Sequence, residues 1–123
     1  MRCEQRGFCL IEIMIVLALI GLIASAVGYV AYRHFRDGQD TAARLQVGEV
    51  LKTVERYTLN KGTCPTLDTL VAENYLRRPP VDPWGTALEL RCPGDHEKDP
   101  ADVISLGRDR KKGTEDDIKS WDQ

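Results

Sequence analysis

An unbroken run of twenty uncharged residues, from Ile13 to Tyr32, limits the possible folds of this chain more than any other feature. At about 1.5 Å of rise per residue, a helix of this length spans about 30 Å, the thickness of a bilayer's hydrocarbon core. The run is apolar on every side of such a helix, and the rest of the chain is too short to build a core around it. The sequence therefore predicts a membrane-spanning helix and excludes a single soluble globule.

A secretory signal peptide is the competing interpretation of this run, because Ala24-Ser25-Ala26 imitates a cleavage site. The apolar part of a signal peptide is usually about 7–15 residues long, however, and the run here continues past Ala26. Two arginines flank the run on each side, Arg2 and Arg6 before it and Arg33 and Arg36 after it, so the positive-inside rule does not orient it. The net charge of −2 argues against nucleic acid as a partner.

A single carboxylate, Glu12, precedes the uncharged run and follows a short apolar stretch. An ionisable residue at the edge of a membrane is costly, so it marks either a functional pairing or simply a position among the lipid headgroups. The surrounding sequence resembles the class III leader of type IV prepilins and type II secretion pseudopilins. The residues that carry this resemblance are Arg6-Gly7-Phe8-Cys9-Leu10-Ile11-Glu12.

The resemblance implies a specific processing of the N-terminus. A prepilin peptidase would remove residues 1–7 by cutting after Gly7, and would methylate the new N-terminal Phe8. Because this cut precedes the apolar run, residues 8–32 would remain as a transmembrane and polymerisation helix. The resemblance also assigns Glu12 to pair with the N-terminal amine of a neighbouring subunit.

The pattern of apolar residues changes beyond Tyr32 to that of an amphipathic helix. Val47, Val50 and Val54 follow a helical spacing and form one stripe with Leu51. This stripe predicts a helix whose continuation, residues 33–60, packs on a small head; a groove for a partner helix is the alternative. A basic residue followed by Gly62 predicts the end of the helix.

The remaining residues, 61–123, predict a small globular head. Thr66 is a suitable N-cap for a short helix through Glu73, and residues 87–92 and 103–106 are strand candidates. The fold class is therefore α+β: a long N-terminal helix packed on a small antiparallel sheet. The resemblance given above implies the same arrangement, that of a type IV pilin-like fold. Cys64 and Cys92 are candidates for a disulfide in an oxidising compartment, with two unrelated buried thiols as the alternative.

Several carboxylates gather in a glycine-punctuated loop near the C-terminus, for which a solvated acidic turn is the simplest interpretation. The C-terminal half nevertheless resembles that of type II secretion major pseudopilins, through the segments 80–85, 92–94, 105–109 and 116–118 and through Trp121. This resemblance implies a bound Ca²⁺ ion. The implied ligands are the Leu106 carbonyl and the side chains of Asp109, Asp116 and Asp117, with Ser105 as a fifth candidate. Four cations in the loop should weaken such a site: Arg108, Arg110, Lys111 and Lys112.

The sequence does not indicate an enzyme. His96 lies alone in a polar turn, which is typical of a surface residue, and no nucleophile or phosphate-binding loop accompanies it. The resemblance instead implies a homopolymeric subunit of the periplasmic pseudopilus. Such a subunit lies in the bacterial inner membrane, works with minor pseudopilins and an assembly platform, and drives exoprotein export. The alternatives are a type IV pilus subunit and a membrane-anchored periplasmic calcium-binding module that does not polymerise.

Overall fold

The computed structural model describes residues 7, 9–96 and 99–122 of the chain. Its contacts divide the chain into two compact units, Met1–Asp37 and Gly38–Gln123. Helix α1, Leu10–Lys61, runs through the first unit and into the second. The predicted leader, apart from Gly7, and the predicted N-terminal residue of the processed chain, Phe8, lie outside the described residues.

The C-terminal end of α1 is where the sequence predicts it. Gly62 adopts a left-handed conformation with φ of 73°, and its N–H donates to the carbonyl of Thr58 at 2.8 Å. Glycine is favoured at this position because it has no Cβ to clash with the preceding turn. Lys61 in the last turn also suits the negative end of the helix dipole.

The predicted apolar stripe is the face that α1 contributes to the core of the second unit. Val47 and Val54 are completely buried there, and Val50 is 3% exposed. The core is completed by Tyr57, which also lies on α1, and by residues from the rest of this unit, namely Leu70, Leu88, Ala101 and Val103. The interpretation of the stripe as a core face is confirmed.

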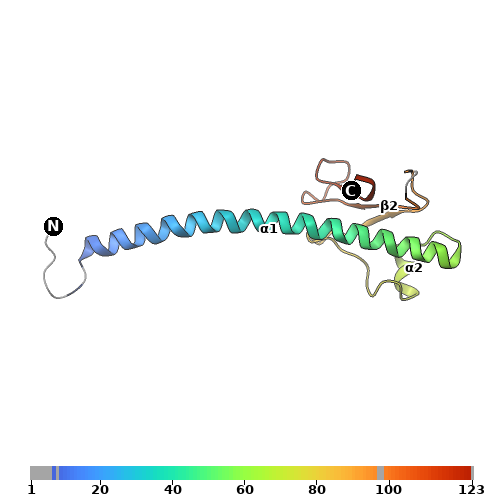
Figure 1. The fold of residues 1–123 in the computed structure, drawn as a ribbon, viewed down its shortest axis with the longest axis horizontal. Coiled ribbons are helices and arrows are strands. Elements are labelled where there is room, and N and C mark those ends of the chain that lie inside the picture. Colours follow the sequence, from blue (N-terminus) through green and yellow to red (C-terminus); the bar gives the residue numbers. More distant parts are fainter. Residues whose placement is uncertain (1–6, 8, 97–98, 123) are drawn as a thin grey trace. The chain divides into compact units, whose positions relative to one another are not determined.

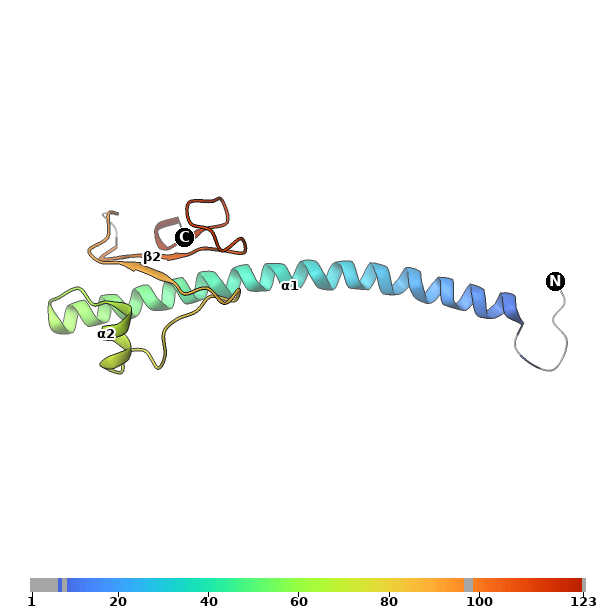
Figure 2. The same ribbon diagram turned by 180° about the vertical axis from the view of Figure 1, so that it is seen from behind.

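A short helix, α2 (Leu67–Ala72), follows α1. Thr66 caps it as predicted, because its hydroxyl accepts a hydrogen bond from the Thr69 N–H at 3.2 Å. Figures 1 and 2 show the second half of α1 with β2 on one side and α2 on the other. Leu70, which is fully buried, is the α2 residue that joins the core.

A three-stranded antiparallel sheet, ordered β1-β2-β3, completes the second unit. Its strands are β1 (Glu89–Arg91), β2 (Asp102–Ser105) and β3 (Ile118–Lys119), and a 3₁₀ turn at Ser120–Asp122 follows. β1 falls within the predicted segment 87–92, and β2 overlaps the predicted segment 103–106 but begins one residue before it. β3, with two residues, was too short to predict. The structure confirms the α+β architecture of a long helix packed on a small antiparallel sheet.

Candidate functional site

The N-terminal part of α1 presents an apolar surface that the chain itself does not cover. Among the described residues, α1 is the helix long and apolar enough to cross a membrane. None of the residues in its most apolar stretch of 18 is buried. Leu22 and Ile23, for example, are 69% and 65% exposed. Such a surface is stable in lipid or against the same surface of other subunits, but not in water.

Glu12 lies in the first turn of α1 and is exposed. A carboxylate in this turn is favoured by the positive end of the helix dipole. Gly7, which precedes the predicted cut, is exposed and has φ of 117°, a conformation that suits glycine. Pairing of Glu12 with the amine of Phe8 concerns a residue outside those described, so it stays a prediction.

The acidic loop connects β2 to β3, and its two ends meet. Gly107, with φ of 74°, lies so close to Asp116 that a Cβ at position 107 would collide with the Asp116 carbonyl. This approach brings the Leu106 end of the loop beside the pair Asp116 and Asp117. The carbonyl and carboxylate oxygens assigned to calcium therefore come from two segments that are in contact.

Two of the three aspartates proposed as calcium ligands accept hydrogen bonds from backbone N–H groups of the loop itself. Asp109 Oδ1 accepts the Lys111 N–H at 3.0 Å, and Asp117 Oδ2 accepts the Gly113 N–H at 2.8 Å. A hydrogen bond with Thr114, followed by that from Lys111, lowers the pKa of the Asp109 carboxyl below its ordinary value. The side chain of Asp116 is exposed.

The hydroxyl of Thr114 stands between several acceptors. Its Oγ1 lies 3.4 Å from Asp117 Oδ1 and 3.2 Å from the Lys111 carbonyl, and it also bonds to Asp109. A hydroxyl has a single proton, so it cannot satisfy all these oxygens at once. In the described part of the chain, no three His, Cys, Asp or Glu side chains converge as a metal site requires. The all-oxygen donor set nevertheless fits the preference of Ca²⁺.

Ser105, the fifth candidate ligand, is the last residue of strand β2, directly before the loop. It is fully buried in β2, its hydroxyl donates to Asp82 Oδ2 at 2.9 Å, and it accepts the Gly107 N–H at 3.4 Å. The other oxygen of Asp82 accepts the backbone N–H groups of Trp84 and Thr86 at 3.1 and 2.8 Å. Ser105 therefore fastens the turn after Pro80 to the sheet and to the start of the loop. Its hydroxyl is engaged in these contacts, and its role as a calcium ligand stays a prediction.

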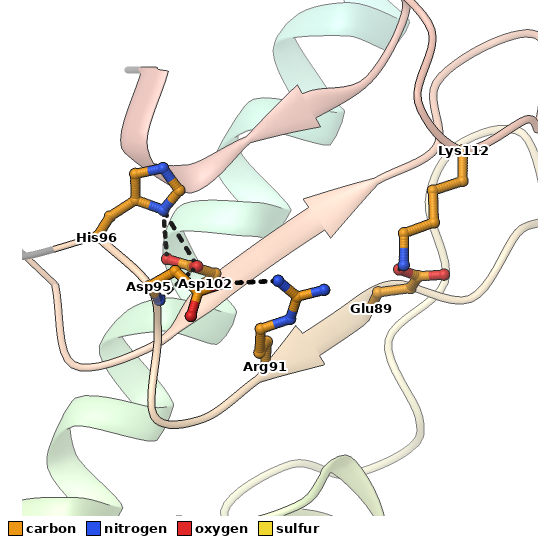
Figure 3. Close-up of polar contacts among 6 residues, drawn as sticks. All are labelled: Glu89, Arg91, Asp95, His96, Asp102 and Lys112. Atoms are coloured by element: carbon orange, nitrogen blue, oxygen red, sulfur yellow. Dashed lines mark hydrogen bonds and ion pairs between the residues drawn. The ribbon is translucent and has the colours of Figure 1, made fainter.

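Two of the four loop cations are engaged with carboxylates outside the loop. Arg108 Nη2 lies 3.4 Å from Asp40 Oδ1 on α1. Lys112 Nζ lies 2.8 Å from Glu89 Oε2 on β1, and Figure 3 shows these two side chains pointing toward one another. The charge crowding expected from the sequence is thus partly relieved by the fold.

The structure contains the predicted disulfide between Cys64 and Cys92, whose Cα atoms are 5.6 Å apart. It joins the segment between α1 and α2 to the residue that follows β1. The cross-link therefore connects the helical side of the second unit to its sheet.

A polar cluster beside the disulfide was missed by the sequence analysis. The carboxylate of Asp102, 2% exposed, accepts the Asp95 N–H at 2.9 Å, and His96 Nδ1 lies 3.1 Å from both of its oxygens (Figure 3). The His96 ring also stacks on Trp121, with centroids 3.9 Å apart. His96 is thus a structural residue that joins the loop after β1 to the C-terminal turn. No periodicity marks such a cluster, since it joins residues distant in the sequence.

These features define a class of protein: a pilin-like subunit, with an apolar N-terminal helix and a small α+β head. A family model described as type II secretion system protein G matches residues 31–121, and one for the prokaryotic N-terminal methylation motif matches residues 2–28. The chain therefore belongs to the family of type II secretion system protein G. This assignment decides between the expected alternatives in favour of the secretion system over a type IV pilus.

Similar proteins cover nearly the whole chain. The chain is 37% identical to type II secretion system core protein G of Escherichia coli K12, over 96% of this chain and 92% of that protein. It is 35% identical to the core protein G of Pectobacterium carotovorum, over 96% and 85%. The crystal structure of the major pseudopilin of enterohaemorrhagic E. coli matches with a TM-score of 0.62 and 26% identity, over 75% of this chain and 94% of that one.

The family fixes the general role of the chain. It is a structural subunit of the type II secretion pseudopilus, and its family is not one of enzymes. The methylation motif and the apolar helix indicate that the chain is anchored in a membrane.

Proposed function

We propose that the chain is an inner-membrane pseudopilin whose head, residues 61–123, lies in the periplasm. Prepilin peptidase cuts it after Gly7 and methylates Phe8. The methylation motif that matches residues 2–28 supports this processing. A disulfide in the head also suits an oxidising compartment such as the periplasm.

Assembly occurs through the N-terminal helix, and the uncovered apolar surface of α1 is the observation that carries this proposal. A head-to-tail contact that does not close builds a helical filament, with one apolar helix from each subunit in its interior. Within that interior, Glu12 pairs with the amine of a neighbouring Phe8, because a carboxylate in lipid is stable only beside a cation. With minor pseudopilins and an assembly platform, filament growth moves exoproteins outward.

The variant Glu12→Ala tests the pairing. We expect it to insert into the membrane as the wild type does and to form no filaments, because the amine of the neighbouring subunit loses its partner. Filament assembly would be followed by electron microscopy of sheared fractions and insertion by membrane flotation. Glu49→Ala, a change at another exposed glutamate of α1, is the matched control. Normal filaments from Glu12→Ala would overturn the pairing.

The mass of the mature protein tests the processing. We expect the loss of residues 1–7 and the gain of one methyl group on Phe8. An N-terminus near Val27 would instead indicate an ordinary signal peptide. An intact N-terminus in cells that contain the peptidase would equally contradict the proposal.

We further propose that the acidic loop binds Ca²⁺ through the Leu106 carbonyl and the carboxylates of Asp109, Asp116 and Asp117. The oxygen donor set, the contact between the two ends of the loop, and the single proton of Thr114 shared among several acceptors all support a cation there. The bound ion would neutralise carboxylates that the loop's own donors satisfy only in part, and it would thereby stabilise the head.

Thermal melting of the full chain in a non-ionic detergent tests this site. A ligand present at 100 times its dissociation constant stabilises the folded state by about 2.7 kcal/mol, which corresponds to a shift of several degrees. We expect millimolar Ca²⁺ to raise the midpoint relative to chelator, and Asp117→Asn to abolish the rise. Asp68→Asn, on the exposed side of α2, should retain it. An equal midpoint with Ca²⁺ and with chelator would remove the metal from the proposal.

A further inference from the structure

The loop that we assign to calcium contains four cationic side chains, which should repel a bound Ca²⁺ ion. Two of them, Arg108 and Lys112, form ion pairs with carboxylates outside the loop. The ammonium of Lys112 is held 2.8 Å from Glu89 on β1. The guanidinium of Arg108 is held 3.4 Å from Asp40 on α1, and its central carbon lies 5.8 Å from the centre of the Trp84 ring. Asp40 and Glu89 are far apart in the sequence, on α1 and β1 respectively, and neither belongs to the loop.

We propose that Asp40 and Glu89 are positioning residues that set the affinity of the loop for a divalent cation. They hold Arg108 and Lys112 off the loop carboxylates, so that these carboxylates keep the negative charge that the ion needs. The proposal rests on the calcium site proposed above and adds its regulation by residues outside it.

The argument is electrostatic. A cation beside the loop repels a bound Ca²⁺ and competes for its ligands, and both effects grow as the distance falls. Lys111 follows Asp109 by two residues, and its backbone N–H donates to Asp109 Oδ1 at 3.0 Å, so the loop has a cationic residue close to a proposed ligand. An ammonium paired with a carboxylate outside the loop forms a dipole, by contrast, whose repulsion of a bound ion falls off faster with distance than that of a lone charge.

The two pairs should not contribute equally. The side chain of Arg108 is 29% exposed and also lies over Trp84, so it has a second contact that remains when Asp40 is removed. The side chain of Lys112 is 56% exposed, and Glu89 is its ion-pair partner in the structure. Neutralising Glu89 therefore frees its cation more completely than neutralising Asp40 does.

Calcium titration calorimetry of the full chain in a non-ionic detergent, arranged as a double-mutant cycle, tests the inference. We expect Glu89→Gln to weaken Ca²⁺ binding about three- to tenfold in the wild-type background, a range typical of directly coupled side chains. In the Lys112→Gln background the same change should have no effect, because there is no ammonium left to release. Asp40→Asn should weaken binding less, and again only while Arg108 is present.

The controls separate positioning from other causes. Lys111→Gln, which removes an exposed loop cation, should tighten binding, and Asp68→Asn should leave it unchanged. The melting temperature in chelator should be the same for the wild type and Glu89→Gln, since an exposed ion pair adds little stability. If Glu89→Gln weakened Ca²⁺ binding equally in the wild-type and Lys112→Gln backgrounds, Glu89 would act through its own charge. That result would overturn this inference and leave the proposed calcium site standing. A wild-type chain without Ca²⁺ binding would overturn the calcium site and this inference together.

Discussion

The two halves of helix α1 have the same secondary structure and opposite relations to the rest of the chain. In the N-terminal half, large apolar side chains such as Leu22 are more than half exposed. In the second half, Val47 and Val54 are completely buried by residues of the head. The more hydrophobic half is thus the less buried one. Hydrophobicity therefore indicates only that a surface must be covered, and the covering can come from within the chain or from outside it.

The comparison separates two kinds of stability in one molecule. The second half of α1 is held by the core and the disulfide, both of which a single chain provides. The first half depends on lipid or on other subunits, so its contribution appears only in a membrane or a filament. Substitutions in the two halves should accordingly affect different measurements.

The largest expected effect on folding is that of Leu70→Ala. Leu70 is the fully buried residue that α2 contributes to the core, and truncation of a buried leucine costs about 2–5 kcal/mol. Denaturant unfolding of the full chain in detergent should show this loss. Leu22→Ala, the same change at a side chain 69% exposed, should leave the unfolding midpoint unchanged. A comparable loss for both variants would contradict the division between the halves.

Removal of the disulfide should come next. Cys64 and Cys92 are 28 residues apart, and a loop of that size implies a stabilisation of about 3–4 kcal/mol in the chain-entropy model. We expect Cys64→Ser with Cys92→Ser to lower the melting temperature of the head and to leave membrane flotation unaffected. Reduction of the wild type with dithiothreitol should reproduce the loss, while the double variant should no longer respond to the reductant.

A smaller loss is expected for Ser105→Ala. The substitution leaves one oxygen of the buried Asp82 without its hydroxyl donor, which costs about 1–3 kcal/mol. Because Ser105 faces Asp82, the dissociation constant for Ca²⁺ should not change. A large fall in Ca²⁺ affinity, measured by calorimetry at a temperature where the variant is folded, would instead show that Ser105 is one of the ligands.

The smallest expected effect is that of Thr114→Val, which should change only the pKa of the Asp109 carboxyl. The hydrogen bond with Thr114 is the main cause that lowers the pKa of Asp109, so its removal should raise that pKa toward the ordinary value. A depressed carboxyl pKa adds stability above the unfolded-state value, and this stability is lost as the pH falls through the folded-state value. NMR titration of the Asp109 carboxyl carbon in chelator measures the change. An unchanged pKa would show that Thr114 does not donate to Asp109.

The long helix and its end could be predicted because the information is local and periodic. The uncharged run, the stripe that includes Val47 and Val54, and Gly62 each have a direct physical meaning. The cap at Thr66 belongs to the same category. Strand β3 could not be predicted, because two residues show no alternation and the pairing of Ile118 with Ser105 depends on the loop between them.

The site was predictable only in part, for a related reason. Resemblance placed candidate calcium ligands in the loop, but a serine adjacent to a ligand in sequence need not face it in a strand, where side chains alternate. Ser105 instead meets Asp82, which is 23 residues away. The pairs of Arg108 with Asp40 and of Lys112 with Glu89 likewise join distant residues. Such partners become visible only when the chain is folded.

The close approach of Gly107 to Asp116 has a consequence for the thermodynamics of ion binding. Because the backbone at these two positions is already in contact, the segment between them is a closed ring before any ligand arrives. Closing a flexible loop has an entropic cost that a bound ion must otherwise offset. In this protein the loop is already closed when the sheet folds, so ion binding does not have to offset that entropy. A side chain at position 107 would collide with the Asp116 carbonyl and separate the two ends of the loop.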